Sequence, residues 1–442
     1  MFDDARGHAV TATNPSALEA YERALRAFHT YRGDPLQPLD EAIRIDPGFA
    51  AAYAAKALIL CTIFERRFMR DAVATLQNGR EALERASARE RALAEAAAEL
   101  ARGHWQAGVQ KLEQVLLAHP RDILALQAAH LMDFFRGDAL NLRNRISRVL
   151  PAWDRSIPGY AYVLGMHAFG LEECNDYVAA ERTGRRAVEL CGDDSWAVHA
   201  VAHVMEMQGR IGEGLQWYED TRAVWAGEDN GFAFHNAWHT ALFHMDRGEF
   251  GRALEVFDAR LADGGEIALV RIDATALLWR LMLEGVDVRS RFIPIAHAWE
   301  RALDEEGGFY AFNDFHATLA FAAAGRRESL ARIREALERA EREPGANADM
   351  TRHVARPACA AAIDYCEGRY AAAAEKLAAM RDSASRFGGS HAQRDLLTLT
   401  LIDAATRAGL RDLARHYANE RLVHKPHSAW GKRLAARAGA VN

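Results

Sequence analysis

Four histidines in the middle of the chain stand in two pairs, His199 with His203 and His235 with His239. The members of a pair are four residues apart, so on a helix both rings project from the same face. The two pairs are themselves 36 residues apart, since 235 − 199 and 239 − 203 both equal 36. Imidazole titrates near neutral pH and is a common metal ligand, so this spacing predicts acid–base or metal chemistry.

Further polar residues at comparable places in the chain extend this candidate site. A carboxylate beside a histidine fixes its tautomer, and an arginine can grip an anionic group with two hydrogen bonds. The candidate catalytic residues are His199, His203, Glu206, His235, His239, Asp314 and His316. The candidate ligand-binding residues are Glu173, Trp196, Asn236, Trp238, Asn313, Gln393, Arg394 and Asp395.

The two HxxxH pairs have a chelating spacing, but the residues inside the first pair are Ala200, Val201 and Ala202, so it is no HExxH motif. If a divalent metal is bound, its candidate ligands are His199, His203, His235 and His239, and its identity stays open. The chain has no GxGxxG after a strand, no GxxxxGK[ST] and no GxSxG. Dinucleotide, P-loop and α/β-hydrolase sites are therefore disfavoured.

A structural interpretation competes with the chemical one. Duplication of a repeat places equivalent residues in register whatever their role. A histidine on a helix rich in small residues can simply satisfy hydrogen bonds where two helices meet. The sequence alone leaves both interpretations open.

The elements that would position these residues are helix pairs. Asp46-Pro47-Gly48 separates two apolar helices, and similar breaks follow at 136–138, 175–177, 209–210 and 248–250. A proline or glycine turn between paired helices, repeated at about 34 residues, resembles a tetratricopeptide repeat. We expect an all-α tetratricopeptide-like superhelix of about eleven helix pairs, an array that could curl until its ends approach.

No Ser-, Gly- or Pro-rich linker long enough to separate domains is evident, so we expect one domain over 1–442. The histidine-rich repeats would span 161–262 and the C-terminal repeats 310–423. Asn14 and Ser16 are candidate caps for the first helix. After the turn at 209–210 we expect one helix that passes through Trp217 and ends at Trp225. We also expect a loop over 343–350 and a basic tail after 423.

Composition narrows the class of protein. The chain has 442 residues, 50% of them hydrophobic, and a net charge of −6, which disfavours general affinity for nucleic acid. Its apolar runs are too short to cross a bilayer, and its N-terminal residues do not form a secretory signal. Five cysteines without a CxxC pair indicate reduced thiols. We expect a cytoplasmic protein that binds neither membrane nor nucleic acid.

Several of these stretches also carry a family resemblance. The segments WAVHAVAHVMEM at 196–207, HNAWHTAL at 235–242, FNDFHATLA at 312–320 and GGSHAQRD at 388–395 resemble motifs of the tetratricopeptide repeat protein 38 family. The likeness runs from about 15 to 420. It implies a soluble all-α repeat protein and supports the candidate residues inside the motifs, together with Glu173. It implies no established activity, and His130 and His167 fall outside the motifs.

Two functions follow from this sequence. The first is a polar concave pocket that binds a small molecule and catalyses acid–base or metal-assisted chemistry on it. The second is a scaffold that binds a protein or peptide segment in its groove. Tetratricopeptide clamps for carboxylate termini commonly use Lys, Asn and Arg, whereas the polar positions here are rich in histidine.

Overall fold

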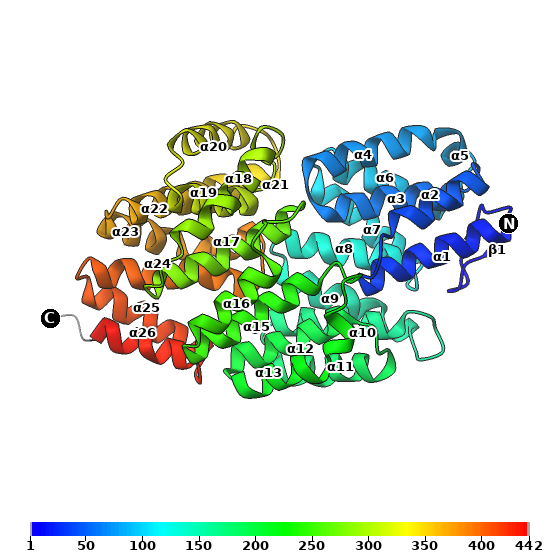
Figure 1. Ribbon diagram of the computed structural model, residues 1–442. Coiled ribbons are helices and arrows are strands. Elements are labelled where there is room, and N and C mark those ends of the chain that lie inside the picture. The colour runs from blue at the N-terminus through cyan, green and yellow to red at the C-terminus, as the bar shows by residue number, and fades with distance from the viewer. Residues whose placement is uncertain (1, 440–442) are drawn as a thin grey trace. The chain divides into compact units, whose positions relative to one another are not determined.

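The computed structural model describes residues 2–439, which are predominantly helical (Figure 1). Two short antiparallel strands, β1 (Phe2–Asp3) and β2 (Ala9–Val10), precede the first helix. Helix α1 (Pro15–Thr30) begins after Asn14, whose side chain accepts a hydrogen bond from the Ser16 backbone N–H. This bond satisfies one of the free donors at the helix start, so Asn14 is the cap.

Helix pairs joined by short turns make up the fold, which is a tetratricopeptide-like α-helical repeat, as predicted. In residues 2–439 the pairs are α1 with α2 (Leu36–Ile45), α3 (Ala50–Ile63) with α4 (Arg66–Asn78), α6 (Ala88–Ala101) with α7 (Trp105–Ala118), α8 (Ile123–Phe135) with α9 (Ala139–Val149), α10 (Tyr160–Glu173) with α11 (Tyr177–Leu190), α12 (Ser195–Gln208) with α13 (Ile211–Asp220), α15 (Ala233–Arg247) with α16 (Phe250–Arg260), α17 (Ala268–Leu283) with α18 (Arg289–Glu306), α19 (Ala311–Ala323) with α20 (Arg327–Ala340), α22 (Arg356–Cys366) with α23 (Tyr370–Met380), and α24 (His391–Arg407) with α25 (Arg411–His424). These eleven pairs match the predicted number.

Glycines with positive φ end the first helix of several pairs. Gly209 has φ 68° after α12, and Gly248 has φ 76° after α15. A left-handed residue lets the chain reverse directly after a helix, and glycine adopts it without a Cβ clash. The predicted turns at 209–210 and 248–250 are therefore confirmed.

Three local predictions are wrong. The segment 343–350 contains helix α21 (Ala346–Met350), which continues through a π-helical turn, η2 (Thr351–Ala355), into α22. The expected basic tail forms helix α26 (Ala429–Gly439), which buries Trp430 and Leu434. The single helix expected to pass through Trp217 and end at Trp225 is broken at Thr221 into α13 and α14 (Arg222–Trp225).

The remaining helical segments are short. They are α5 (Arg80–Glu84) and the 3₁₀ segments η1 (Leu150–Ala152) and η3 (Arg381–Phe387). All five cysteines are free, as the sequence predicts. Among residues 2–439, no helix has the length and apolar character needed to cross a bilayer.

The chain divides into two compact units. The first comprises 1–201 with 223–233, and the second comprises 202–222 with 234–442. The boundary falls inside α12, so His199 belongs to the first unit and His203 to the second. The predicted arrangement of 1–442 as one domain stays a prediction.

The first and second helices of a pair differ in burial. Helices α8, α17, α19 and α24 bury nearly every residue, whereas α4, α11 and α25 bury a single face. The polar side chains of a helix that is buried on all sides contact other protein groups and not water. Polar residues on these first helices must therefore find partners inside the fold.

Candidate metal centre

Three histidines of the second unit converge, one from α12 and two from α15. Each of His203, His235 and His239 offers a ring nitrogen, and these nitrogens lie within 4.8 Å of one another. The ring centroids of His203 and His239 are 4.4 Å apart, and those of His235 and His239 are 4.9 Å apart. His203 and His239 are fully buried and His235 is 5% exposed. The four-residue spacing on α15 aims both of its rings toward α12.

Two of these histidines are oriented by carboxylates. His235 donates its Nδ1–H to Asp273 Oδ2 over 2.7 Å, and His239 donates its Nδ1–H to Glu206 Oε2 over 3.0 Å. A carboxylate can only accept, so each Nδ1 carries the proton and Nε2 keeps its lone pair. This arrangement is typical of metal-ligating histidines, because the carboxylate fixes the tautomer and makes the ligand more basic.

The pKa of Glu206 shows how strongly these groups interact. Burial alone would raise this pKa, but the charge of Lys425 and the hydrogen bond from His239 outweigh burial and hold it well below its ordinary value. Burial lowers the pKa of His239 well below its ordinary value, and the neighbouring His203 lowers it further. Burial raises the pKa of Asp273, although His235 opposes this shift. The centre therefore pairs a neutral His239 with an ionised Glu206.

A buried chain of alternating charges continues from Glu206. Lys425 donates to Glu206 Oε1 over 2.8 Å and lies 3.6 Å from Asp395. Arg421 donates to Asp395 from Nε over 2.9 Å and from Nη2 over 2.8 Å. Burial would raise the pKa of Asp395, but Arg421 and Lys425 lower it to about 2. These pairings offset the desolvation of each charge.

A small cavity of about 10 Å³ lies within this chain of charges, lined by Glu206, Arg280, Asp395 and Lys425 among others. That volume is about the size of a single water molecule. Asp395, a predicted ligand-binding residue, thus lies beside the carboxylate that orients His239.

Trp238 and Asn236 contact the same region. The indole of Trp238 stacks on His235, with centroids 5.4 Å apart and planes 16° apart. The guanidinium carbon of Arg280 lies 5.3 Å from the Trp238 ring. Asn236 accepts a hydrogen bond from the Tyr218 hydroxyl over 3.2 Å. These contacts hold the side chains of α15 in place around its two histidines.

Predicted residues at α19 make local contacts. Asp314 accepts a hydrogen bond from the backbone N–H of Gly308 over 3.0 Å, in the loop before the helix. His316 donates from Nδ1 to the Phe312 carbonyl over 2.8 Å. Asn313 is buried on the same helix.

Predicted residues at the start of α24 contact its own N-terminus. Gln393 and Ser390 form a capping box, each side chain accepting a hydrogen bond from the other residue's backbone N–H. Gln393 also bonds to Asp273 and thereby lowers that carboxyl's pKa. Arg394 donates to the backbone carbonyl of Gly389. Ser390, Gln393 and Arg394 thus stabilise the start of α24. Of these three, Gln393 also reaches a carboxylate of the histidine centre.

The other predicted residues belong to the first unit. His199 packs among the rings of Phe169, Trp196 and Phe232, with centroids 5.4, 5.3 and 5.1 Å away. Glu173 is buried at the end of α10. His199 lies one helical turn before His203 on the same side of α12, and as a fourth metal ligand it stays a prediction.

Sequence reasoning missed Asp273, Lys425 and Arg421. Asp273 has a local signal, because it is a lone acid in the apolar run from Ile272 to Leu278, 34 residues after His239. Lys425 has none, because it follows α25 and lies 219 residues from its partner Glu206.

Comparisons with known proteins add little to this geometry. No protein-family model matches this chain. The chain is similar in structure to the APC/C hetero-tetramer Cut9–Hcn1 (12% identity, 96% of this chain and 76% of that chain, TM-score 0.47) and to the human IFIT1 dimer with m7Gppp-AAAA (12% identity, 97% and 95%, TM-score 0.45). It is also similar to the P58(IPK) TPR domain (15% identity, 89% and 98%, TM-score 0.21). With TM-scores below 0.5 these likenesses carry no argument about function, and the family resemblance of the four motifs stays a prediction.

Proposed function

We propose that this helical repeat protein binds one divalent transition-metal ion through a ring nitrogen of His203 and the Nε2 atoms of His235 and His239. The observation that carries the proposal is the pairing of Nδ1 with a carboxylate at two of three clustered histidines. A purely structural histidine needs a hydrogen bond, but it does not need a second and a third imidazole beside it.

Zinc is the first candidate for a site with three imidazole ligands. Neutral imidazoles suit zinc, copper, iron and nickel, whereas magnesium and calcium require oxygen ligands. Three histidines with a fourth position for water or another ligand are a known catalytic zinc arrangement. When bound, such an ion acts as a Lewis acid and lowers the pKa of its water. Glu206 and Asp273 supply negative charge directly behind the ligands.

Metal binding, rather than turnover of a large organic substrate, is the function we propose. The three rings are buried, and the neighbouring cavity beside Glu206 has about the volume of one water molecule. Catalysis on a small molecule, the predicted peptide-binding groove and the predicted cytoplasmic location stay predictions.

The test uses the full chain after removal of metal with a chelator. We expect titration calorimetry with Zn²⁺ to give one ion per chain, and Co²⁺ to give a visible absorption band of imidazole coordination. His203→Gln and His239→Gln should each weaken Zn²⁺ binding at least tenfold. His316→Gln, a buried histidine of α19, is the matched control and should bind as the wild type does.

Two results would overturn the proposal. One is a folded, chelator-treated wild type that binds neither Zn²⁺ nor Co²⁺. The other is unchanged affinity in both centre variants. Helical content and melting temperature, measured on every variant, separate lost binding from lost structure.

A further inference from the structure

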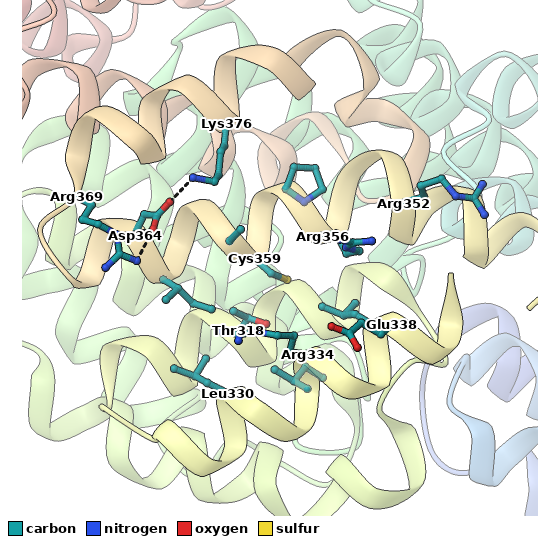
Figure 2. Close-up of a pocket in the computed structure, with 15 residues that line it drawn as sticks. Thr318, Leu330, Arg334, Glu338, Arg352, Arg356, Cys359, Asp364, Arg369 and Lys376 are labelled. Carbon is teal, nitrogen blue, oxygen red and sulfur yellow. Dashed lines mark hydrogen bonds and ion pairs between the residues drawn. The ribbon is translucent and has the colours of Figure 1, made fainter. Parts of the chain in front are cut away.

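The second unit has a cavity of about 650 Å³ between α20 and α22, away from the histidine centre (Figure 2). Its charged groups are paired with one another, and Figure 2 shows Asp364 held between Arg369 and Lys376. None of the described residues that line it has a buried side-chain polar atom without a hydrogen-bond partner. A cavity of the first unit differs in this respect.

This cavity of the first unit has a volume of about 540 Å³, which falls within the range of sites for organic ligands. Its walls come from α1, from the loop before α10 and the first turn of that helix, and from the end of α11. It shares no residue with the histidine centre, so a ligand bound here is independent of the metal proposed above.

One wall of the cavity carries a buried imidazole. His29 on α1 is 5% exposed, and its Nδ1–H donates to the side-chain oxygen of Gln127. The Gln127 amide is oriented by its own hydrogen bond, in which Nε2 donates to the Phe28 carbonyl over 3.1 Å. Burial lowers the pKa of His29 to about 4, so the ring is neutral at pH 7 and its Nε2 is an acceptor.

The Nε2 atom of His29 is buried and has no hydrogen-bond partner among residues 2–439. Gln127, which faces Nδ1, is not part of the described cavity lining, so the opposite edge of the ring, which carries Nε2, faces the hollow. A buried acceptor that lacks a donor destabilises the fold. A ligand with a hydroxyl group supplies that donor.

The first turn of α10 adds backbone donors to the same cavity. Residues 159–162 line it, and no described side chain caps this helix. The N–H groups of Tyr160 and Val163 donate to backbone carbonyls, whereas those of Ala161 and Tyr162 have no acceptor in the part of the chain that the structure describes. Free N–H groups at the positive end of a helix dipole bind phosphate and other anions.

The ion pairs around the cavity leave one cation available. Arg6 donates to both oxygens of Glu22 over 2.7 and 2.8 Å, and Arg26 donates to Asp193 over 2.7 Å. These two arginines are therefore already neutralised. Arg155 lies in the loop before α10, is exposed, and forms no ion pair within residues 2–439. An anion here is thus held by backbone donors and one exposed arginine.

We propose that this cavity binds a sugar phosphate. The phosphate accepts hydrogen bonds from the N–H groups of Ala161 and Tyr162 near Arg155, and a sugar hydroxyl donates to Nε2 of His29. Inorganic phosphate alone leaves most of the 540 Å³ unfilled. An organic group without hydroxyls leaves the buried acceptor of His29 unpaired.

The test is calorimetric titration of the full chain with glucose 6-phosphate and ribose 5-phosphate. We expect at least one of them to bind with a dissociation constant below about 1 mM. Glucose lacks the anion, cyclohexyl phosphate lacks the hydroxyls, and inorganic phosphate lacks the sugar. Each of these three should bind at least about tenfold more weakly, because each leaves one set of protein groups without a partner.

His29→Asn tests the acceptor. Asparagine keeps a group that can donate to Gln127 but has no atom at the position of Nε2. This variant should bind the sugar phosphate at least about tenfold more weakly and bind cyclohexyl phosphate as the wild type does. His130→Asn changes another buried histidine of the first unit, which does not line the cavity, and should bind the sugar phosphate normally.

Ala161→Pro tests the helix N-terminus. It removes one N–H at the second residue of α10, a position at which α22 has Pro357. Sugar phosphate and cyclohexyl phosphate should both bind more weakly. Val178→Pro makes the same change at the second residue of α11 and should bind as the wild type does.

The proposal is overturned if neither sugar phosphate binds, or if cyclohexyl phosphate or inorganic phosphate binds as tightly as they do. Unchanged affinity in folded His29→Asn and Ala161→Pro also overturns it. If those variants do not fold, the exposed change Arg155→Gln decides, because it should weaken both organic phosphates. His239→Gln should bind the sugar phosphate normally, so failure of the metal proposal leaves this test intact.

Discussion

The orientation of a single imidazole decides what the histidine centre can do. His235 and His239 each place one nitrogen on a carboxylate, Asp273 and Glu206 respectively. The second nitrogen of each ring is thereby defined as a lone-pair donor. The four-residue spacing within each pair was visible in the sequence, but the carboxylate partners come from other helices.

Removal of one of these carboxylates should weaken metal binding without removing a ligand. Asp273→Asn keeps the size of the side chain but loses the charge behind His235, and we expect Zn²⁺ affinity to fall about 10–100-fold. Calorimetric titration measures the change. Asp403→Asn alters a buried carboxylate that pairs with Arg407 and Tyr365, and should bind Zn²⁺ as the wild type does. Equal affinities in the two variants would contradict the role of Asp273.

His316 should make the stability of the second unit depend on pH. Burial lowers the pKa of His316 to about 3, against 6.5 when exposed, so the unfolded chain binds a proton there that the folded chain does not. As pH falls from 6.5 toward 3, this difference should reduce the free energy of unfolding by about 1.4 kcal/mol per unit. Well above pH 6.5 the histidine is neutral in both states, so it does not change the free energy of unfolding.

Urea denaturation of wild type and His316→Leu at pH 7.5 and pH 5.5 checks this dependence. The variant loses the Phe312 hydrogen bond at both pH values, so only the change with pH is informative. We expect the wild type to lose about 1 kcal/mol more than the variant between the two values. A stability difference between wild type and variant that is the same at both pH values would show that folding does not lower the pKa of His316.

At the scale of the elements, close helix contacts position α15. Gly214 on α13 faces Phe243 of α15, and a Cβ at Gly214 would lie 2.4 Å from the Phe243 Cζ atom. Phe243 is fully buried and therefore has little room to move. The absence of a side chain at Gly214 is what lets the two helices approach.

Substitution of two glycines on the same helix tests this contact. Gly214→Ala should destabilise the protein by about 1–3 kcal/mol, because the added methyl overpacks the buried ring. Gly212→Ala is the control, since its Cβ would meet nothing within 4 Å, and it should be neutral or stabilise by up to about 1 kcal/mol. Thermal and urea unfolding of both variants measure the two effects. Similar stabilities would refute the packing argument.

At the scale of the whole chain, residues far apart in sequence complete the centre. Lys425 lies just after α25, yet its ammonium group bonds to Glu206 on α12, 219 residues earlier. Ser428 and the backbone N–H of Ala429 both donate to Asp246 on α15. The C-terminal segment thus binds the two helices that carry His203 and His239.

Removal of Lys425 should be costly because it leaves Glu206 as an uncompensated buried charge. We expect Lys425→Met to destabilise the protein by about 3–5 kcal/mol. Adding Glu206→Gln to that variant should recover part of the loss, which a double-mutant cycle in urea measures. Lys111→Met breaks an exposed pair with Glu95 and should cost under about 1 kcal/mol. A loss for Lys425→Met as small as that for Lys111→Met would exclude a buried pair.

The sequence by itself determined the repeat and its helix pairs. Periodic apolar residues and glycines such as Gly209 and Gly248 act locally, so they define where a helix ends without reference to the rest of the chain. The pairing of His199 with His203 and of His235 with His239 follows from the same local geometry.

Only the tertiary structure decided which polar groups meet. Asp314 and Asp273 are both acids on buried first helices, yet the first bonds to the loop at Gly308 and the second orients His235. Lys425 lies next to Glu206 because packing brings α25 and its following loop beside α12. Such contacts depend on how successive helices pack across the fold. The spacing of two residues along the chain does not predict the distance between their side chains.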